Sequence, residues 1–393
     1  FMRMRFLHTA DWQIGKPFQS VEEPAKREAL RKQRVDTVRA LRALIDRENP
    51  KFMVVSGDAF DSFTPDAATV SAFCSAAGEL ELPVYLIPGN HDSGAPGCIW
   101  EQSFFQSEAA SLCPNLSVLL EAAPVVREDA VLLPCPLASR RPSEDPTAWL
   151  RRLDQDLPAD RPRIVIAHGS VHGFSSSGDH DAEASVDILQ LNQLPPGLAD
   201  YIALGDWHGT KQVLPNAWYS GTPEQDRFAR GDNNPGNVLL VALESHGTAP
   251  EVKIHPSGEI GWHELDFTLA SDDALTDLEE EIRQLLGART GRDLLKLRLE
   301  GSLSLEGESR FARLLEQLEA RLIELRLERR ISVIPSRKEL DALVHRNDPI
   351  IATVASELSE EASAATETAA PNPAKEALAL LFKEVKRLEN ETG

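Results

Sequence analysis

The sequence predicts an α/β protein in which layered sheets are flanked by helices, followed by a small α+β domain. Two patterns in residues 1–257 indicate the α/β class: short continuous apolar runs that end in polar residues, and helical stretches between them. Continuous apolar runs are typical of strands buried on both faces. Later in this region apolar and polar residues alternate, which indicates further antiparallel strands. We therefore expect mixed sheets and not a purely parallel one.

The predicted elements of this first domain begin in βαβ order. Five apolar runs predict strands, and two helical patterns separate the first three of them. The strands are expected at 5–7, 52–55, 84–87, 164–167 and 201–204, and the helices at 24–48 and 65–80. The alternating segments near 118–133 and 237–254 are expected to add strands to the same layers.

A second domain is predicted over residues 258–345. Leucines at 295, 297 and 299 alternate with charged residues, which indicates a half-buried strand. Further leucines then follow at helical spacing and predict one face of a helix: Leu314, Leu315, Leu318, Leu322 and Leu325. Residues 346–374 include a stretch of low complexity and predict a linker. Residues 375–393 predict a C-terminal helix whose apolar face would dock a partner.

The charge balance excludes nucleic-acid binding by bulk positive charge. The chain has 393 residues and a net charge of −21, from 41 basic and 62 acidic residues. Residues 1–50 are an exception, with eleven basic and seven acidic side chains. This local excess predicts either a solvated helix face or a patch that faces phosphate.

Cysteine use and hydropathy indicate the compartment. The four cysteines have no C-x-x-C spacing, so we expect core residues in a reducing environment and no disulfide framework or structural zinc site. No apolar run reaches the roughly 20 residues of a membrane-spanning helix. No N-terminal stretch has the order of a signal peptide. We therefore expect a cytoplasmic protein without a membrane segment.

Polar residues with metal-binding side chains follow all five apolar runs. Ligands gather at the carboxyl ends of strands in layered α/β proteins. One aspartate after a strand is usually a helix cap or turn residue, but five such strand ends predict a shared site. Carboxylate, amide and imidazole ligands without sulfur suit Mn²⁺ or Mg²⁺ better than zinc alone. The candidate ligands are Asp11, Gln13, Asp58, Asn90, His168, Asp206 and His208.

The spacing within three motifs sharpens this prediction. The motifs are Asp11-Trp12-Gln13, Gly57-Asp58-Ala59-Phe60-Asp61 and Gly89-Asn90-His91-Asp92. Glycine before a ligand allows close backbone approach and unusual torsion angles. Together with the segments around His168 and His208, these motifs resemble those of the calcineurin-like metallophosphoesterase superfamily. Within it, residues 4–335 resemble the bacterial SbcD-type DNA repair nucleases.

The resemblance implies a fold and a role for each candidate residue. The implied fold is a four-layer β-sandwich flanked by helices, with the α+β domain as a cap. Two metal ions would be held, with Asp58 bridging them. By resemblance Asp11 and His208 bind the first metal, Asn90 and His168 bind the second, His91 is the general acid, and Asp61 orients His91. Gln13 and Asp206 stand where the family usually has histidine, and each still offers a ligand oxygen.

The implied function is metal-dependent phosphodiester hydrolysis on DNA. Two metal ions can clamp a phosphate and activate a water molecule, and a histidine can protonate the leaving oxygen. We expect a Mn²⁺- or Mg²⁺-dependent exonuclease or single-strand endonuclease of double-strand break repair. Its expected partners are DNA, an SbcC-like coiled-coil ATPase and a second copy of the chain.

Two alternatives stay open. The changes at Gln13 and Asp206 could leave a weakly active subunit that binds DNA ends or regulates the ATPase. The same chemistry could also act on a small phosphodiester or phosphomonoester, although the capping domain argues against a small substrate.

Overall fold

The computed structural model describes residues 3–140, 144–153, 157–171, 188–228, 233–344, 348–364 and 373–392. The chain divides into two units, Phe1–Gly261 and Trp262–Gly393. Within the described ranges, no helix is both long enough and apolar enough to cross a membrane.

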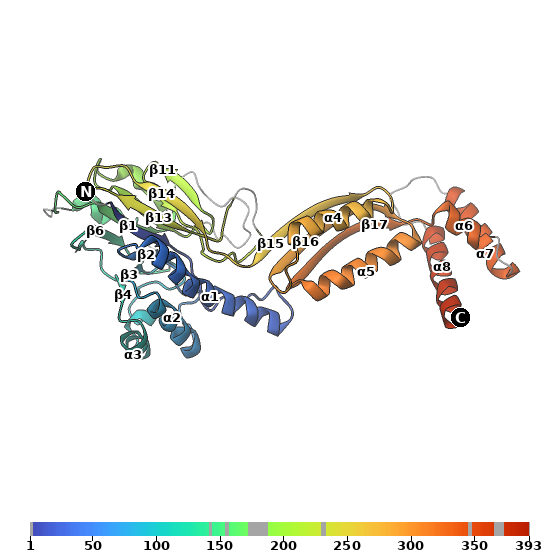
Figure 1. Ribbon diagram of the computed structural model, residues 1–393, viewed down its shortest axis with the longest axis horizontal. Helices are drawn as coiled ribbons and strands as arrows, with labels where there is room; N and C mark the ends of the chain where they lie inside the picture. The colour runs from blue at the N-terminus through green and yellow to red at the C-terminus, as the bar shows by residue number, and fades with distance from the viewer. Residues whose placement is uncertain are drawn as a thin grey trace. The chain divides into compact units, whose positions relative to one another are not determined.

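The first unit contains a six-stranded mixed sheet in the described chain (Figure 1). Its strand order is β14-β13-β1-β2-β3-β4. Strands β1 to β4 run parallel to one another. Strand β13 pairs antiparallel with both β1 and β14. The bounds are β1 (Met4–Thr9), β2 (Met53–Ser56), β3 (Val84–Ile87), β4 (Leu116–Val118), β13 (Asn237–Leu243) and β14 (Glu251–Pro256).

A second six-stranded sheet of the described chain has the order β11-β12-β10-β7-β6-β5. Its central strands are parallel, and the pairing of β7 with β10 sets Gly205 opposite His168. The bounds are β5 (Val125–Val126), β6 (Val131–Cys135), β7 (Arg163–His168), β10 (Tyr201–Gly205), β11 (Lys211–Leu214) and β12 (Ala217–Tyr219). A separate short pair joins β8 (Ser170–Val171) and β9 (Ile188–Leu189).

Alternating side chains of the strands build the layers of this unit. On one face of the first sheet, Leu7 and Met53 pack against helices α1 (Pro24–Glu48), α2 (Ala67–Glu79) and α3 (Ser103–Leu112) (Figure 1). On the other face, Phe6 and Val54 pack against Ile166 of the second sheet. The two sheets therefore face each other across a shared core.

Short helices cover the outer face of the second sheet. There Val165 and Leu204 pack beneath side chains of η2 (Ala148–Arg152) and η3 (Leu191–Gln193). Another 3₁₀ turn, η1 (Ile99–Glu101), precedes α3. The predicted four-layer α/β sandwich is confirmed, with 3₁₀ helices and loops in its fourth layer.

The second unit begins with a three-stranded sheet and two helices. The sheet order is β15-β16-β17, and β16 pairs with β17 in parallel. The bounds are β15 (Gly261–Leu269), α4 (Ala274–Leu286), β16 (Asp293–Leu303), α5 (Leu305–Arg321) and β17 (Glu324–Val333). The predicted α+β character is confirmed.

One helix of this unit ends earlier than the leucine spacing predicts. Helix α5 stops at Arg321, and Leu322 is already extended with φ −89° and ψ 151°. Leu325 lies on β17, opposite Leu295 of β16. Leu325 packs on the same core as the helix leucines. Its position in the sequence therefore fits the helical spacing, although the residue belongs to a strand.

Three helices follow among the described C-terminal residues, and one of them lies in the predicted linker. They are α6 (Arg337–Val344), α7 (Pro349–Ala364) and α8 (Pro373–Thr392). The linker prediction over 346–374 is wrong where α7 lies, because Ala355 of α7 is buried against Leu378 and Val385 of α8. The composition of the segment concealed this helical face. Residues 365–372 of the predicted linker lie outside the described residues.

Candidate metal centre

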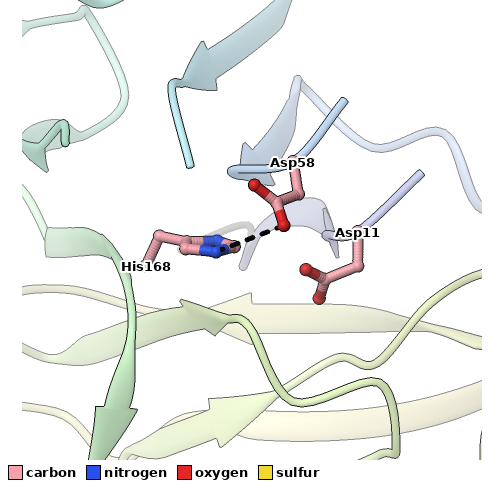
Figure 2. Close-up of side chains that lie close together, drawn as sticks. All are labelled: Asp11, Asp58 and His168. Atoms are coloured by element: carbon pink, nitrogen blue, oxygen red, sulfur yellow. Dashed lines mark ion pairs between the residues drawn. The ribbon is translucent and has the colours of Figure 1, made fainter. Parts of the chain in front are cut away.

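Three buried side chains meet where strands β1, β2 and β7 end. Asp11, Asp58 and His168 each offer one ligand atom, and these atoms all lie within 4.8 Å of one another (Figure 2). Strands β1 and β2 are neighbours in the first sheet, while β7 belongs to the second. The site therefore lies at the edge shared by the two facing sheets, as the parallel strand ends predict.

The backbone at these strand ends is strained. Asp11, Gln13, Asp58 and Asp206 have φ values of 54°, 41°, 55° and 101°. Positive φ is uncommon outside glycine, and such residues concentrate at functional sites. Hydrogen bonds hold the conformation, since the amide of Asp11 donates to the carbonyl of Gly57 at 3.0 Å.

Glycines allow the ligand loops to approach closely. A Cβ atom at Gly57 would lie 2.3 Å from Nδ1 of His168. A Cβ atom at Gly89 would lie 2.1 Å from Oδ1 of Asp58. Real Cβ atoms do not tolerate such distances, so both positions require glycine for packing.

His168 presents one nitrogen to the carboxylates. Its Nδ1–H donates to the carbonyl of Ser56 at 2.8 Å, so in the neutral ring the lone pair that can bind a cation is on Nε2. Nε2 lies 3.5 Å from Oδ2 of Asp58 and 3.9 Å from Oδ1 of Asp206, and it is buried without a hydrogen-bond partner. Burial lowers the pKa of His168, but the charges of Asp58, Asp11 and Asp206 outweigh it and raise the pKa to about 9.

The centre carries an excess of buried acid. Burial raises the pKa of Asp11 well above its usual range, and the neighbouring charges of Asp58 and Asp206 add to the rise. Burial likewise raises the pKa of Asp206. The Oδ1 atom of Asn90 is also buried without a hydrogen-bond partner. These carboxylates outnumber the single imidazole of His168 among them, and excess buried carboxylate is costly. The oxygen and nitrogen donors of these side chains therefore fit a divalent cation.

Two other predicted ligands are paired with each other instead. Gln13 Nε2 lies 3.3 Å from His208 Nε2, and Gln13 Oε1 accepts a hydrogen bond from Lys16 Nζ at 2.8 Å. His208 Nδ1 lies 3.2 Å from Oδ1 of Asp226. Burial lowers the pKa of His208 to about 4, against the opposing charge of Asp226. His208 is absent from the mutually close group of ligands found among the described residues.

The candidate general acid lies at the rim of the centre. The side chain of His91 is 36% exposed, and its Nε2 lies 3.9 Å from Oδ2 of Asp58. Its Nδ1 lies 2.8 Å from the backbone carbonyl of Asp61. The Asp61 carboxylate lies instead 3.5 Å from Lys16 Nζ. The resemblance implied that Asp61 orients His91. In the structure it is the backbone carbonyl of Asp61, and not its carboxylate, that contacts His91.

Sequence reasoning missed three buried residues that support the centre. Arg34 of α1 donates to the backbone carbonyls of Asp11 at 3.0 Å and Trp12 at 2.8 Å. Asp92 accepts from the amide of Gly89 at 2.7 Å, and burial with the nearby charge of Asp58 raises its pKa to about 7. Asp92 stands inside a quoted motif and could have been found there. Arg34 and Asp226 had no such local signal.

The basic excess of residues 1–50 forms a paired helix surface. Lys32 pairs with Asp36 on the same helix face, and Arg42 pairs with Asp46 at 2.8 Å. Arg34 is buried and donates to the backbone carbonyls of Asp11 and Trp12, which follow β1. These contacts are those of a solvated helix face.

Comparisons with known proteins find partial similarities. A 94-residue stretch is 34% identical to the SbcD subunit of the nuclease SbcCD of Bacillus subtilis (strain 168), and it spans 23% of this chain and 22% of that protein. The solved structure of TT1561 of Thermus thermophilus has a TM-score of 0.38 and 14% identity, over 64% of this chain and 99% of that one. Another solved structure has a TM-score of 0.41 and 13% identity, over 65% and 100%.

The match to a family model covers a much larger part of the chain. The model of calcineurin-like phosphoesterases matches residues 4–210, more than half of the sequence. The matched region contains the Asp11, Asp58 and His168 group and the other strand-end residues. The chain therefore belongs to the calcineurin-like phosphoesterase family.

Proposed function

We propose that this phosphoesterase is a DNA nuclease of the double-strand break repair type, acting on ends or single-stranded regions. The observation that carries the proposal is the buried Asp11, Asp58 and His168 group, with Nε2 of His168 unpartnered. The partial identity to a nuclease subunit supports the choice of DNA among phosphodiesters. Mn²⁺ is the expected ion, with Mg²⁺ as the other hard cation suited to these donors.

Each residue has a distinct task in the proposed reaction. A bound divalent cation supplies Lewis acidity to the phosphate group. Asp11, Asp58, His168, Asn90 and Asp206 would hold it. His91 is available to act on substrate, because its Nδ1–H is held by the Asp61 carbonyl and its Nε2 faces the centre. A protonated Nε2 can deliver its proton to the leaving oxygen.

The partner proposal rests on the C-terminal helices. Leu378 and Val385 of α8 are covered within the second unit, so the docking face predicted from the sequence is only partly exposed. Leu380 and Leu388 of the same helix remain 63% and 50% exposed. We propose that they contact an SbcC-like coiled-coil ATPase. The double variant Leu380→Glu/Leu388→Glu should abolish ATPase binding, whereas Leu112→Glu on exposed α3 should not.

Two further proposals concern assembly and compartment. The chain is proposed to form a homodimer, which light scattering at several concentrations would test by its mass. A cytoplasmic location is supported by the four cysteines, all of which are buried and free. Free thiols are typical of reducing compartments.

A nuclease assay tests the proposed function. Linear duplex and circular single-stranded DNA are incubated with the protein and Mn²⁺, Mg²⁺ or Zn²⁺. We expect cleavage that is strongest with Mn²⁺ and that a chelator abolishes. Cleavage that survives the chelator, or hydrolysis of small phosphodiesters with no action on any DNA, would refute the proposal.

A second candidate function is favoured by the pairing of Gln13 with His208. These two potential ligands hydrogen-bond to each other, so the chain could be a weakly active subunit that binds DNA ends or regulates the ATPase. In that case DNA ends would bind and be cut only slowly with every metal. A filter-binding assay run beside the nuclease assay separates the two functions.

A further inference from the structure

Three hydrogen bonds and one ion pair join four side chains beside the metal centre into a closed ring. Lys16 Nζ donates to Gln13 Oε1 at 2.8 Å and lies 3.0 Å from Asp226 Oδ2. Gln13 Nε2 lies 3.3 Å from His208 Nε2, and His208 Nδ1 lies 3.2 Å from Asp226 Oδ1. Gln13 and His208 stand at positions that supply first-metal ligands in the resemblance described above.

The donors and acceptors of this ring are mutually consistent. The Asp226 carboxylate only accepts, and its Oδ2 lies 3.1 Å from His208 Nδ1, nearer than the Arg227 guanidinium at 3.4 Å. The hydrogen of the neutral His208 ring is therefore placed on Nδ1. Nε2 of that ring is then an acceptor and receives a hydrogen from the amide nitrogen of Gln13. The amide oxygen of Gln13 in turn accepts from the ammonium group of Lys16. Both atoms that a first metal ion would need, His208 Nε2 and Gln13 Oε1, are therefore already in use.

The charge around the ring is also compensated. The Asp226 side chain is 1% exposed, and Lys16 Nζ lies close to it and 3.5 Å from Oδ1 of Asp61. Arg227 Nε also lies 3.3 Å from Asp226 Oδ1. A divalent cation at the first-metal position would have to displace the Lys16 ammonium group, which the Asp226 and Asp61 carboxylates hold. The carboxylate of Asp58, by contrast, faces the imidazole of His168.

We infer that Lys16 takes the place of a first metal ion, so that each chain binds one divalent cation at Asp11, Asp58 and His168. The inference rests on the proposed function and concerns the number of ions at its site. The ring turns a position that usually holds a metal into one held by a side-chain cation. Gln13, which stands where the family usually has histidine, and Lys16 then act together to exclude the first metal ion.

Metal stoichiometry tests the inference independently of catalysis. Mn²⁺ alone is titrated into the full chain by calorimetry, and bound Mn²⁺ is counted after gel filtration. We expect one ion per chain in the parent and one in Gln13→His, because Lys16 still holds Asp226. Lys16→Met in the Gln13→His background should bind two. Lys32→Met in the same background removes an exposed positive charge from α1 and should stay at one.

The outcomes decide between the alternatives. Two ions in the parent or in Gln13→His would overturn the inference, as would one ion in the Lys16→Met double variant. Neither result would bear on the proposed nuclease function. Absence of any bound Mn²⁺ in the parent would overturn both the inference and the proposed function. Thermal melting verifies that each variant is folded. Lys16→Gln, which keeps a polar side chain, replaces Lys16→Met if the methionine variant does not fold.

Discussion

His168 Nδ1 lies 2.8 Å from the carbonyl oxygen of Ser56, the last residue of strand β2. The bond connects the second sheet to the first, because His168 ends β7 and Ser56 ends β2. A carbonyl only accepts, so this contact fixes the tautomer in which Nε2 is free for a cation. The sandwich of two sheets thereby sets both the position and the chemical form of the ligand.

Gly57→Ala should weaken cation binding through His168. The new Cβ atom would lie 2.3 Å from His168 Nδ1 and 2.9 Å from the Cα atom of Gly89. Displacing a ligand from its supporting contact typically costs about 10–100-fold in metal affinity. Calorimetric titration with Mn²⁺ measures the loss. Gly97→Ala is the matched control, because Gly97 also has positive φ but its Cβ would meet nothing within 4 Å. Equal affinities in the two variants would contradict the account.

His91→Ala should keep Mn²⁺ and DNA binding and lose most of the cutting. The side chain touches the Asp61 carbonyl and lies at the rim, so it is positioned for substrate. Loss of a general acid typically lowers the rate by about 10²–10⁴-fold. Single-turnover cleavage rates measure the effect. His255→Ala, on β14, is the control and should cut like the parent. A loss of bound Mn²⁺ in His91→Ala would make His91 a ligand.

Asp61→Asn should reduce cutting far less than His91→Ala does. The backbone carbonyl of Asp61 holds His91, and this contact survives the substitution. The carboxylate instead faces Lys16 Nζ at 3.5 Å and takes no part in the bond that positions His91. We expect a change of less than about tenfold in the same cleavage assay. A loss as large as that of His91→Ala would show that the carboxylate itself orients the acid.

His8 should make the free energy of unfolding fall as the pH is lowered. Burial lowers the pKa of His8 to about 3, although the Leu204 carbonyl opposes the shift. Below the ordinary histidine pKa of 6.5, His8 binds a proton in the unfolded chain but stays neutral in the folded chain. Each pH unit below that value costs about 1.4 kcal/mol of stability until the pH nears the folded pKa.

Urea unfolding of the parent and of His8→Gln, at about pH 7 and about pH 5, measures this contribution. Asp92 works in the opposite direction, since its pKa of about 7 favours the folded state as the pH falls. The comparison of the two proteins removes that effect. The parent should lose about 2 kcal/mol more than His8→Gln over this range. Parallel pH profiles would show that His8 is not a buried neutral imidazole.

Local patterns predicted the strands, and they predicted that Asp11, Asp58 and His168 lie close together. The apolar runs at 5–7, 52–55 and 164–167 predicted the strands that end at Thr9, Ser56 and His168. Parallel strands bring their carboxyl ends together. Asp11 and Asp58 could therefore be placed near His168 from sequence alone. The same reasoning failed at Leu325, where a strand residue packs on the core that the helix leucines share.

The remaining features depend on contacts between distant parts of the chain. Arg34 lies in the middle of α1, and only the fold brings it to the carbonyls of Asp11 and Trp12. Asp226 lies on a loop whose meeting with Lys16 and His208 has no signature in sequence spacing. The sequence identified Gln13 as a departure, but the ring that explains it requires three-dimensional placement.

Hydrolysis of a chromogenic phosphodiester by the parent and by His168→Ala tests the central claim most directly. Such a substrate separates the chemistry of the centre from DNA recognition. We predict Mn²⁺-dependent, chelator-sensitive hydrolysis by the parent, lowered by about 10²-fold or more in His168→Ala with the fold retained. Hydrolysis at the parental rate in His168→Ala would contradict the assignment of Asp11, Asp58 and His168 as the catalytic metal centre.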